Sequence, residues 1–247
     1  EKSDELRAIA VEQGFKNIAF EFEPIAAARD YESKLTKEEL VLVVDIGGGT
    51  SDFSVIRLSP AARLNPDRSG DILANAGVHI GGTDFDKRFS LDVVMPHFGY
   101  GSKLKNNLDA PKTEFHMLAT WHLINFLYTQ KNKTAIRNIY NDSEERNLIK
   151  RFMNVLENQR GHDIAAQVES AKIILSEHSN TIMDLGFVEQ DWTLSSTQID
   201  LIRATENDVS KIVTTALQTV GRGAGLSTSA IDSIFMTGGS TALPGFI

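Results

Sequence analysis

The chain has 247 residues and a net charge of −8, and 41% of its residues are hydrophobic, which is an ordinary globular composition. It contains no cysteine, so a disulfide scaffold, thiolate metal sites and a cysteine nucleophile are excluded. The sequence has neither a long Lys/Arg run nor an apolar run of about 20 residues. It therefore predicts no nucleic-acid groove and no membrane span, in a protein of the cytoplasm.

The period of the apolar residues predicts the strands and helices. Strands are expected at 17–23, 40–44, 51–58, 72–80 and 233–236. Helices are expected at 4–13, 25–34, 84–94, 163–177 and from 198 to about 220. Ser195 and Gln198 are expected to form a capping box at the start of the last helix. The alternation of strands and helices predicts an α/β fold with a partly parallel sheet.

The segment from Asp45 to Asp52 carries the strongest functional signal. Its three glycines, 47–49, let the backbone turn tightly, and successive N–H groups in such a turn can surround a phosphate. Thr50 adds a hydroxyl donor, and the carboxylates of Asp45 and Asp52 are suited to hold Mg²⁺ through its waters. The segment lacks the lysine of a P-loop. On the residues alone, a glycine-rich hairpin with two surface aspartates is the alternative.

Two further turns have related chemistry. Gly81-Gly82-Thr83-Asp84 and Gly238-Gly239-Ser240-Thr241 each follow an expected strand and precede an expected helix. Free N–H groups and the positive dipole end at a helix N-terminus favour anions. Each turn taken alone is more simply a tight turn with a helix cap. Three such turns in one chain favour a nucleotide.

These turns and other segments resemble, in the same order, motifs of the seventy-kilodalton heat-shock (DnaK-like) chaperones of the actin-like ATPase superfamily. Residues 45–52 are similar to the second phosphate loop of that family. The other similar segments are 23–28, at the helix that crosses between the lobes, 81–86, 168–176 with its Glu, Lys and Ser, and 238–241 at the adenosine. The resemblance implies an actin-like (ribonuclease H-like) fold in which this chain is lobe II. That lobe has a mixed sheet flanked by helices and a smaller α+β subdomain.

The resemblance also implies roles for the matched residues. Asp45, Asp52 and Thr50 would be catalytic, with the two aspartates near Mg²⁺ and the attacking water, and Glu23 would bind a water of the metal. The nucleotide-binding residues would be Gly47, Gly48, Gly49 and Thr50 at the phosphates, Gly81, Gly82, Glu169, Lys172 and Ser176 at the ribose and adenine, and Gly238, Gly239 and Ser240 at the nucleoside. The implied cofactors are ATP or ADP and Mg²⁺.

The chain departs from the family at the adenine. Two arginines of the family enclose the base, and the matching positions here are Ile173 and Ala242. Each lost guanidinium contact costs about 0.5–2 kcal/mol, so the two losses together weaken binding by about ten-fold or more. The sequence therefore indicates a divergent member of the family.

The resemblance predicts three parts of the chain. Residues 1–39 would be a remnant of lobe I and the crossing helix, 40–80 with 203–247 the larger nucleotide-binding subdomain, and 81–202 a smaller inserted subdomain. No segment matches the first phosphate loop and catalytic lysine of lobe I or the peptide-binding region. We therefore expect a fragment that turns over negligible ATP by itself. Its expected partners are nucleotide, the missing lobe I and substrate-binding regions, and client proteins or co-chaperones.

Two other functional interpretations remain open. The first is another actin-like ATPase, such as a filament protein, a reactivating factor or a sugar kinase. The second is a nucleotide-free interaction module that has kept the fold and lost the adenine site, for which Ile173 and Ala242 are the evidence. Trp121, Phe126 and Tyr128 are expected in the core of the smaller subdomain rather than around a cofactor.

Overall fold

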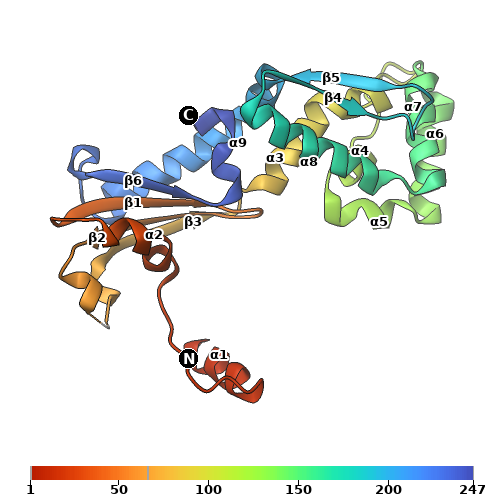
Figure 1. Cartoon of the computed structure of the whole chain (residues 1–247). Coiled ribbons are helices and arrows are strands. Elements are labelled where there is room, and N and C mark those ends of the chain that lie inside the picture. Colours follow the sequence, from red (N-terminus) through yellow and green to blue (C-terminus); the bar gives the residue numbers. More distant parts are fainter. Residues whose placement is uncertain (1, 66, 247) are drawn as a thin grey trace. The chain divides into compact units, whose positions relative to one another are not determined.

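The computed structural model describes residues 2–65 and 67–246, which divide into two compact units (Figure 1). What we call the sheet unit consists of the residues up to Asp45 together with Asp52–Gly77 and Thr215–Thr237. What we call the helical unit consists of Ile46–Ser51, Val78–Thr214 and the residues from Gly238 on. Among the described helices, none is long and apolar enough to cross a bilayer.

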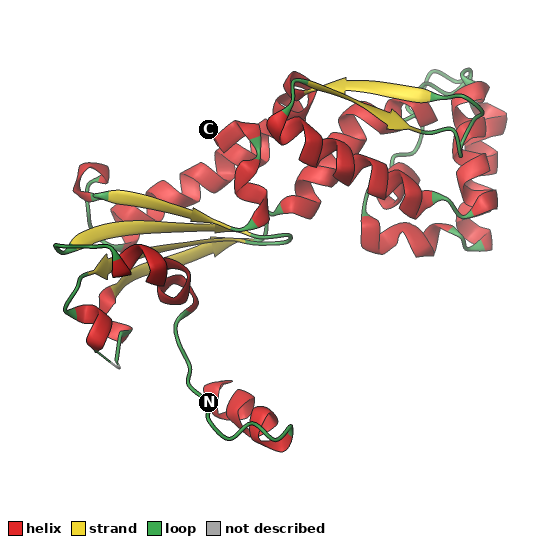
Figure 2. Ribbon diagram, viewed as in Figure 1, coloured by secondary structure: helices red, strands yellow, loops and turns green. Residues whose placement is uncertain are grey.

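The sheet unit contains a four-stranded sheet in the order β3-β2-β1-β6, drawn in yellow in Figure 2. Its strands are β1 (Glu39–Ile46), β2 (Ser51–Leu58), β3 (Ile72–Val78) and β6 (Ser233–Thr237). β1 and β6 run parallel, with Val41 opposite Ser233, whereas a tight turn reverses the chain between β1 and β2. The sheet is therefore mixed, which confirms the α/β class and the mixed sheet expected from the sequence. The continuous apolar run of β1 suits its place inside the sheet, between β2 and β6.

Helix α2 (Glu23–Ser33) packs on the sheet. Pro24 stands in its first turn, where the missing N–H of proline costs no hydrogen bond. The core beneath the helix consists of buried apolar side chains from α2, β1 and β2: Ala28, Val41, Val43, Ile56 and Leu58. Tyr31 adds a polar link at the edge of this core, because its hydroxyl donates to Glu39 Oε2 at 2.6 Å.

A buried ion cluster joins α2 to the loop before β3. The Arg68 guanidinium donates to both carboxylate oxygens of Glu32, at 2.7 and 3.0 Å, and to Asp71 Oδ2 at 2.5 Å. The backbone N–H of Ser59 also donates to Glu32 Oε1, at 3.3 Å. Arg68 is 4% exposed and Glu32 1% exposed, so each charge relies on the other for compensation. This cluster is the main polar anchor of the loop 59–71.

The prediction of a strand at 17–23 is wrong, because the structure has no strand there. The described chain after α1 (Lys2–Glu12) has no regular structure until α2 begins at Glu23. Arg7 lies over the Phe20 ring at 5.1 Å and donates to the Ile18 carbonyl oxygen at 3.3 Å. Alternating residues indicate a strand only where a neighbouring strand can complete the hydrogen bonds. The described sheet gives this segment no such neighbour.

The helical unit is built mainly of helices. These are α3 (Gly82–Phe89), α4 (Thr113–Leu118), α5 (Ile124–Leu127), α6 (Gln130–Asp142), α7 (Arg146–Asn158), α8 (Gly161–Glu177) and most of α9 (Gln198–Gln218). Its core is aromatic: Phe115 and Phe152 are fully buried with ring centroids 5.0 Å apart, and the Phe98 ring meets Phe152 edge-on at 6.4 Å. The π segment Ser90–Val94 continues α3, so the helix expected at 84–94 is only partly regular.

The prediction that Ser195 and Gln198 form a capping box is wrong. Ser195 lies in β5 (Thr193–Thr197), which pairs antiparallel with β4 (Asn180–Asp184) in a hairpin that the sequence did not predict. The cap is formed by the next pair along the chain. The Thr197 N–H donates to Asp200 Oδ2 at 2.9 Å, and the Asp200 N–H donates to Thr197 Oγ1 at 3.3 Å.

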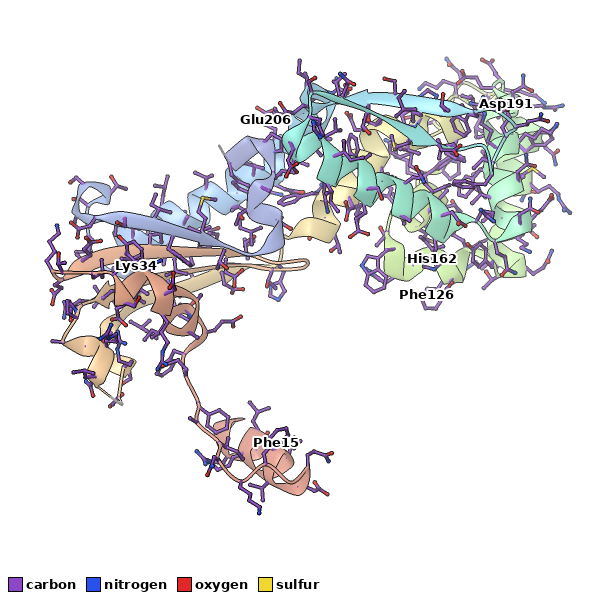
Figure 3. All side chains as sticks on the ribbon, in the orientation of Figure 1. Phe15, Lys34, Phe126, His162, Asp191 and Glu206 are labelled. Carbon is purple, nitrogen blue, oxygen red and sulfur yellow. The ribbon has the colours of Figure 1, made fainter. Side chains whose placement is uncertain are left out.

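The expectation that Trp121 and Phe126 belong to the core is also wrong. Their side chains are 56% and 59% exposed, and Phe126 extends away from the ribbon in Figure 3. Tyr128 is partly buried, and its hydroxyl accepts a hydrogen bond from the Gly161 N–H at 3.0 Å, at the start of α8. The α4–α5 connection, at Trp121, and helix α5, at Phe126, therefore expose aromatic side chains.

Candidate nucleotide site

The turn between β1 and β2 lies against the start of α3, within the helical unit. The Gly47 N–H donates to the Thr50 carbonyl oxygen at 2.9 Å, which closes the turn. The Gly82 N–H donates to the Gly47 carbonyl oxygen at 2.9 Å. The Thr83 N–H donates to the Gly48 carbonyl oxygen at 2.7 Å. The first two glycine turns, which the sequence shows separately, are thus in direct contact.

The third glycine turn joins them. Gly238 has a φ of 88°, a conformation that favours glycine, and it leads into the 3₁₀ turn Gly239–Ala242. From this turn the Ser240 hydroxyl donates to the Gly47 carbonyl oxygen at 3.1 Å. Segments more than 150 residues apart in the sequence therefore meet around one backbone carbonyl.

Gly81 and Gly82 make the close contact between the three turns sterically feasible. A Cβ at Gly81 would lie 2.7–2.8 Å from backbone atoms of Gly47, Gly48 and Gly49, a distance that Cβ atoms do not adopt. A Cβ at Gly82 would lie 2.6 Å from Ser240 Oγ. The glycines at these positions allow close packing of one backbone on another.

Helix α8 presents its expected polar residues along one face. Glu169, Lys172 and Ser176 follow one another at spacings of three and four residues, which places them on the same side of a helix. Lys172 Nζ donates to the Gly82 carbonyl oxygen at 3.2 Å and lies 2.8 Å from Asp86 Oδ1. Burial raises the pKa of the Asp86 carboxyl, the Lys172 charge partly opposes this shift, and the Glu169 charge adds to it. Lys172 therefore ties α8 to the glycine turns and balances a buried carboxyl.

A small cavity of about 100 Å³ lies beside these residues. Its lining comes from α3, α8 and the third glycine turn: Phe85, Lys172, Ile173, Ser176, Glu177, Gly239, Ser240, Ala242 and Leu243. Both positions at which the sequence departs from the family, Ile173 and Ala242, line this cavity. It therefore has apolar walls at the points where the resemblance implies arginine.

The carboxylates expected near the metal line a different cavity, of about 210 Å³, within the sheet unit. Glu23 stands in the first turn of α2, Asp45 near the end of β1 and Asp52 near the start of β2. The complete lining is Phe22, Glu23, Pro24, Ala27, Val43, Asp45, Asp52, Ser54 and Asn75. Among the described residues, no three carboxylate or imidazole side chains are close enough to bind one metal ion directly. The oxygen donors suit Mg²⁺, which keeps several of its waters and can be held through them.

Sequence reasoning missed two polar residues, one in the sheet-unit cavity and one that pairs with Lys172. Asn75 lies on β3 and lines the sheet-unit cavity. Asp86 lies on α3, one turn beyond the helix start, and pairs with Lys172. The sequence segment 81–86, which attracts attention for its glycines, contains Asp86. Its ion-pair partner, Lys172, lies far along the chain on α8, so the sequence does not indicate the pair.

Comparison with known proteins shows similarity to the Hsp70 proteins. Residues 14–118 match the Hsp70 protein family. The chain is 26% identical over 232 residues to the chaperone protein DnaK of Deinococcus proteolyticus, in a match that covers 90% of this chain and 28% of that relative. The chain thus spans well under two thirds of that relative's length. Both matches confirm the resemblance: over these residues the chain is similar to Hsp70 proteins, whose actin-like ATPase fold is the fold class that the motifs predict.

Proposed function

We propose that this chain is part of the nucleotide-binding domain of a heat-shock-70-like chaperone, whose intact form binds ATP with Mg²⁺ and hydrolyses it slowly in the cytoplasm. The observation that carries the proposal is the meeting of three glycine turns beside the polar face of α8. The similarity to a DnaK chaperone supports it. Because the chain spans 28% of that relative, the hydrolysis, the client proteins and the co-chaperones are proposed for the intact protein.

In the helical unit, the proposed roles follow from the chemistry of each group. The amides of Gly48, Gly49 and Thr50 would hold the phosphates, since a concave row of N–H groups favours anions. The Gly47 amide already donates to the Thr50 carbonyl oxygen and closes the turn. Lys172, within reach of the Gly82 carbonyl, places a positive charge at this point. Glu169 and Ser176 supply polar atoms for the ribose, and the apolar cavity beside Ile173 would receive the adenine.

In the sheet unit, Asp45, Asp52 and Glu23 would hold Mg²⁺ through its waters. When bound, the ion would neutralise charge on the phosphates. Phosphoryl transfer to water depends on positioning and charge neutralisation more than on a covalent nucleophile. Asp45 and Asp52 border the phosphate-binding turn in the sequence, so their proposed role is to orient the attacking water, with Thr50 as a hydroxyl donor.

A second candidate function rests on the adenine-side cavity. Ile173 and Ala242 line it where the resemblance implies two arginines, and the cavity is small, about 100 Å³. A chain that has lost base binding while keeping the fold would act as a nucleotide-free interaction module. The two functions differ in one observable property, the affinity for adenine nucleotides.

Restoring the arginines is expected to strengthen nucleotide binding. The variant with both Ile173→Arg and Ala242→Arg should bind MgADP about ten-fold more tightly than the wild-type chain, because each guanidinium can stack on the base for about 0.5–2 kcal/mol. Isothermal titration calorimetry measures both affinities. Ile182→Arg is the matched control, since Ile182 is 68% exposed on β4 and lies outside the cavity lining.

The control is expected to bind MgADP as the wild type does. If the double variant folds and neither it nor the wild type binds MgADP, the nucleotide-free module replaces the ATPase proposal.

A further inference from the structure

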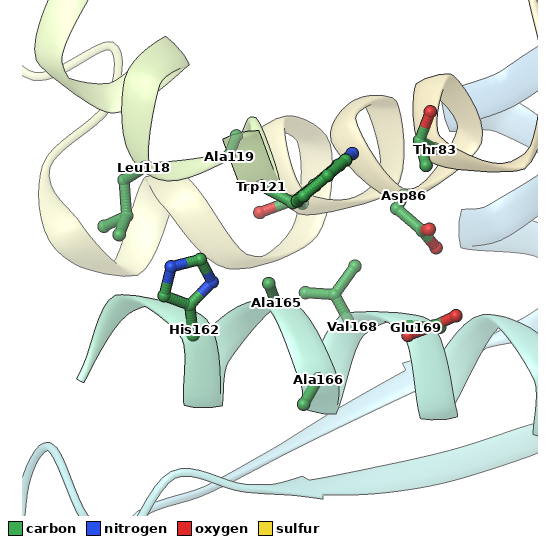
Figure 4. A pocket seen from close by; sticks show the side chains of 11 residues that line it. Thr83, Asp86, Leu118, Ala119, Trp121, His162, Ala165, Ala166, Val168 and Glu169 are labelled. Atoms are coloured by element: carbon green, nitrogen blue, oxygen red, sulfur yellow. The ribbon is translucent and has the colours of Figure 1, made fainter. Parts of the chain in front are cut away.

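A larger cavity, of about 360 Å³, lies in the helical unit outside the adenine-side cavity (Figure 4). Its lining comes from α3, from the α4–α5 connection and from α8: Thr83, Asp86, Ser90, Leu118, Ala119, Trp121, His162, Ala165, Ala166, Val168 and Glu169. We call it the Trp121 cavity. Its volume lies in the range of small-molecule sites. Of the residues given a role above, Glu169 borders this space, and no proposed role uses its aromatic wall.

The aromatic wall is an exposed tryptophan above a floor of short side chains. Figure 4 shows the Trp121 ring above Ala165 and Val168 of α8. The Trp121 side chain is 56% exposed, although tryptophan is highly buried on average. The short side chain of Ala165 leaves space beneath the ring. A flat group could therefore lie between the indole face and α8.

The opposite end of the cavity is acidic. Figure 4 shows the Asp86 and Glu169 carboxylates at the same end of the cavity. Asp86 Oδ1 is buried and forms an ion pair with Lys172 Nζ at 2.8 Å. One lysine thus faces two carboxylates, which leaves this end one positive charge short.

We propose that the Trp121 cavity binds a small organic cation with a planar amidinium or guanidinium head. The head would donate to Asp86 and Glu169, because a planar fork of N–H groups matches carboxylate geometry. The body of the ligand would lie on the Trp121 face, where the negative π-face favours a positive group and the apolar area excludes water. Both ends of the cavity thus select for the same kind of ligand.

Benzamidine and its neutral isostere benzamide test this site. Titrated into the 247-residue chain by calorimetry without nucleotide, benzamidine is expected to bind with a Kd between about 0.1 and 5 mM, as its few atoms allow. Benzamide should bind at least about ten-fold more weakly, because it lacks the positive charge. Asp86→Asn should lower benzamidine affinity about ten-fold. Asp92→Asn, outside the cavity lining, should leave it unchanged.

The aromatic wall has its own matched pair of variants. Trp121→Ala should weaken benzamidine binding about five-fold or more, whereas Phe126→Ala should not, since Phe126 is similarly exposed but does not line the cavity. Because Trp121 is exposed, Trp121→Ala is expected to fold. It therefore tests the site even if Asp86→Asn does not fold. Equal affinities for benzamidine and benzamide, or wild-type affinity in Trp121→Ala, would overturn the proposal. No nucleotide is present, so this outcome is independent of the test of the ATPase proposal.

Discussion

Replacing Arg68 by methionine is expected to lower the free energy of unfolding of the sheet unit by about 3–5 kcal/mol. The substitution leaves the Glu32 carboxylate, which is 1% exposed, without a counter-charge in a buried site. It also removes the donor that holds Asp71. Urea unfolding followed by circular dichroism measures the loss. Such an effect exceeds that of most single substitutions.

Two further variants separate charge burial from loss of packing. Arg29→Met removes an exposed ion pair, in which Arg29 is 66% exposed, so its expected cost is below about 1 kcal/mol. The double variant Glu32→Leu with Arg68→Met replaces the buried pair by apolar groups and should recover most of the lost stability. An Arg68→Met variant as stable as Arg29→Met would mean that the cluster does not anchor the loop 59–71.

Gly81→Ala is expected to destabilise the helical unit by about 1–3 kcal/mol and to weaken MgADP binding at least about ten-fold. The added Cβ would lie 2.7–2.8 Å from backbone atoms of the turn 47–49. Backbone cannot move aside as the end of a flexible side chain can. The turn must therefore shift, and with it the amides that are proposed to bind phosphate.

The control for this substitution lies in the turn that Gly81 contacts. A Cβ at Gly48 would meet no atom within 4 Å, so Gly48→Ala should leave the free energy of unfolding within about 1 kcal/mol of the wild type. Unfolding curves of both variants compare a crowded glycine with an open one. Equal stability of the two variants would show that the close approach of Gly81 to the turn is absent in solution.

Much of the sheet unit could be predicted because its signals are local. The apolar run of β1 indicates a strand buried on both faces, and the structure places it inside the sheet. The segment 17–23 has an equally clear alternation, yet forms no strand, since a strand depends on a partner that the local pattern does not show. The β4–β5 hairpin was not predicted because its sequence lacks a clear strand pattern, although the strands have each other as partners. Its β5 segment, Thr193–Thr197, is mostly Ser and Thr and shows little apolar alternation.

The candidate site could be predicted as a set of motifs but not as an arrangement. The glycine turns and the Glu, Lys and Ser of α8 were all recognised in the sequence. That the Ser240 hydroxyl reaches the Gly47 carbonyl depends on long-range packing, which no local spacing encodes. Trp121 was assigned to the core because aromatic residues are usually buried. The short side chain of Ala165, which leaves space beneath the Trp121 ring, becomes informative only once α8 faces the ring.

The central claim, that the glycine turns and α8 form a nucleotide site, is tested most directly by calorimetric titration of MgADP into the wild-type chain and into Lys172→Met. The account predicts a micromolar to low-millimolar Kd for the wild type and at least about ten-fold weaker binding for Lys172→Met, since the variant removes the positive charge at the Gly82 carbonyl. Lys150→Met, at an exposed position on α7, should bind as the wild type does. Equal binding by the wild type and a folded Lys172→Met, or no binding by the wild type, would contradict it.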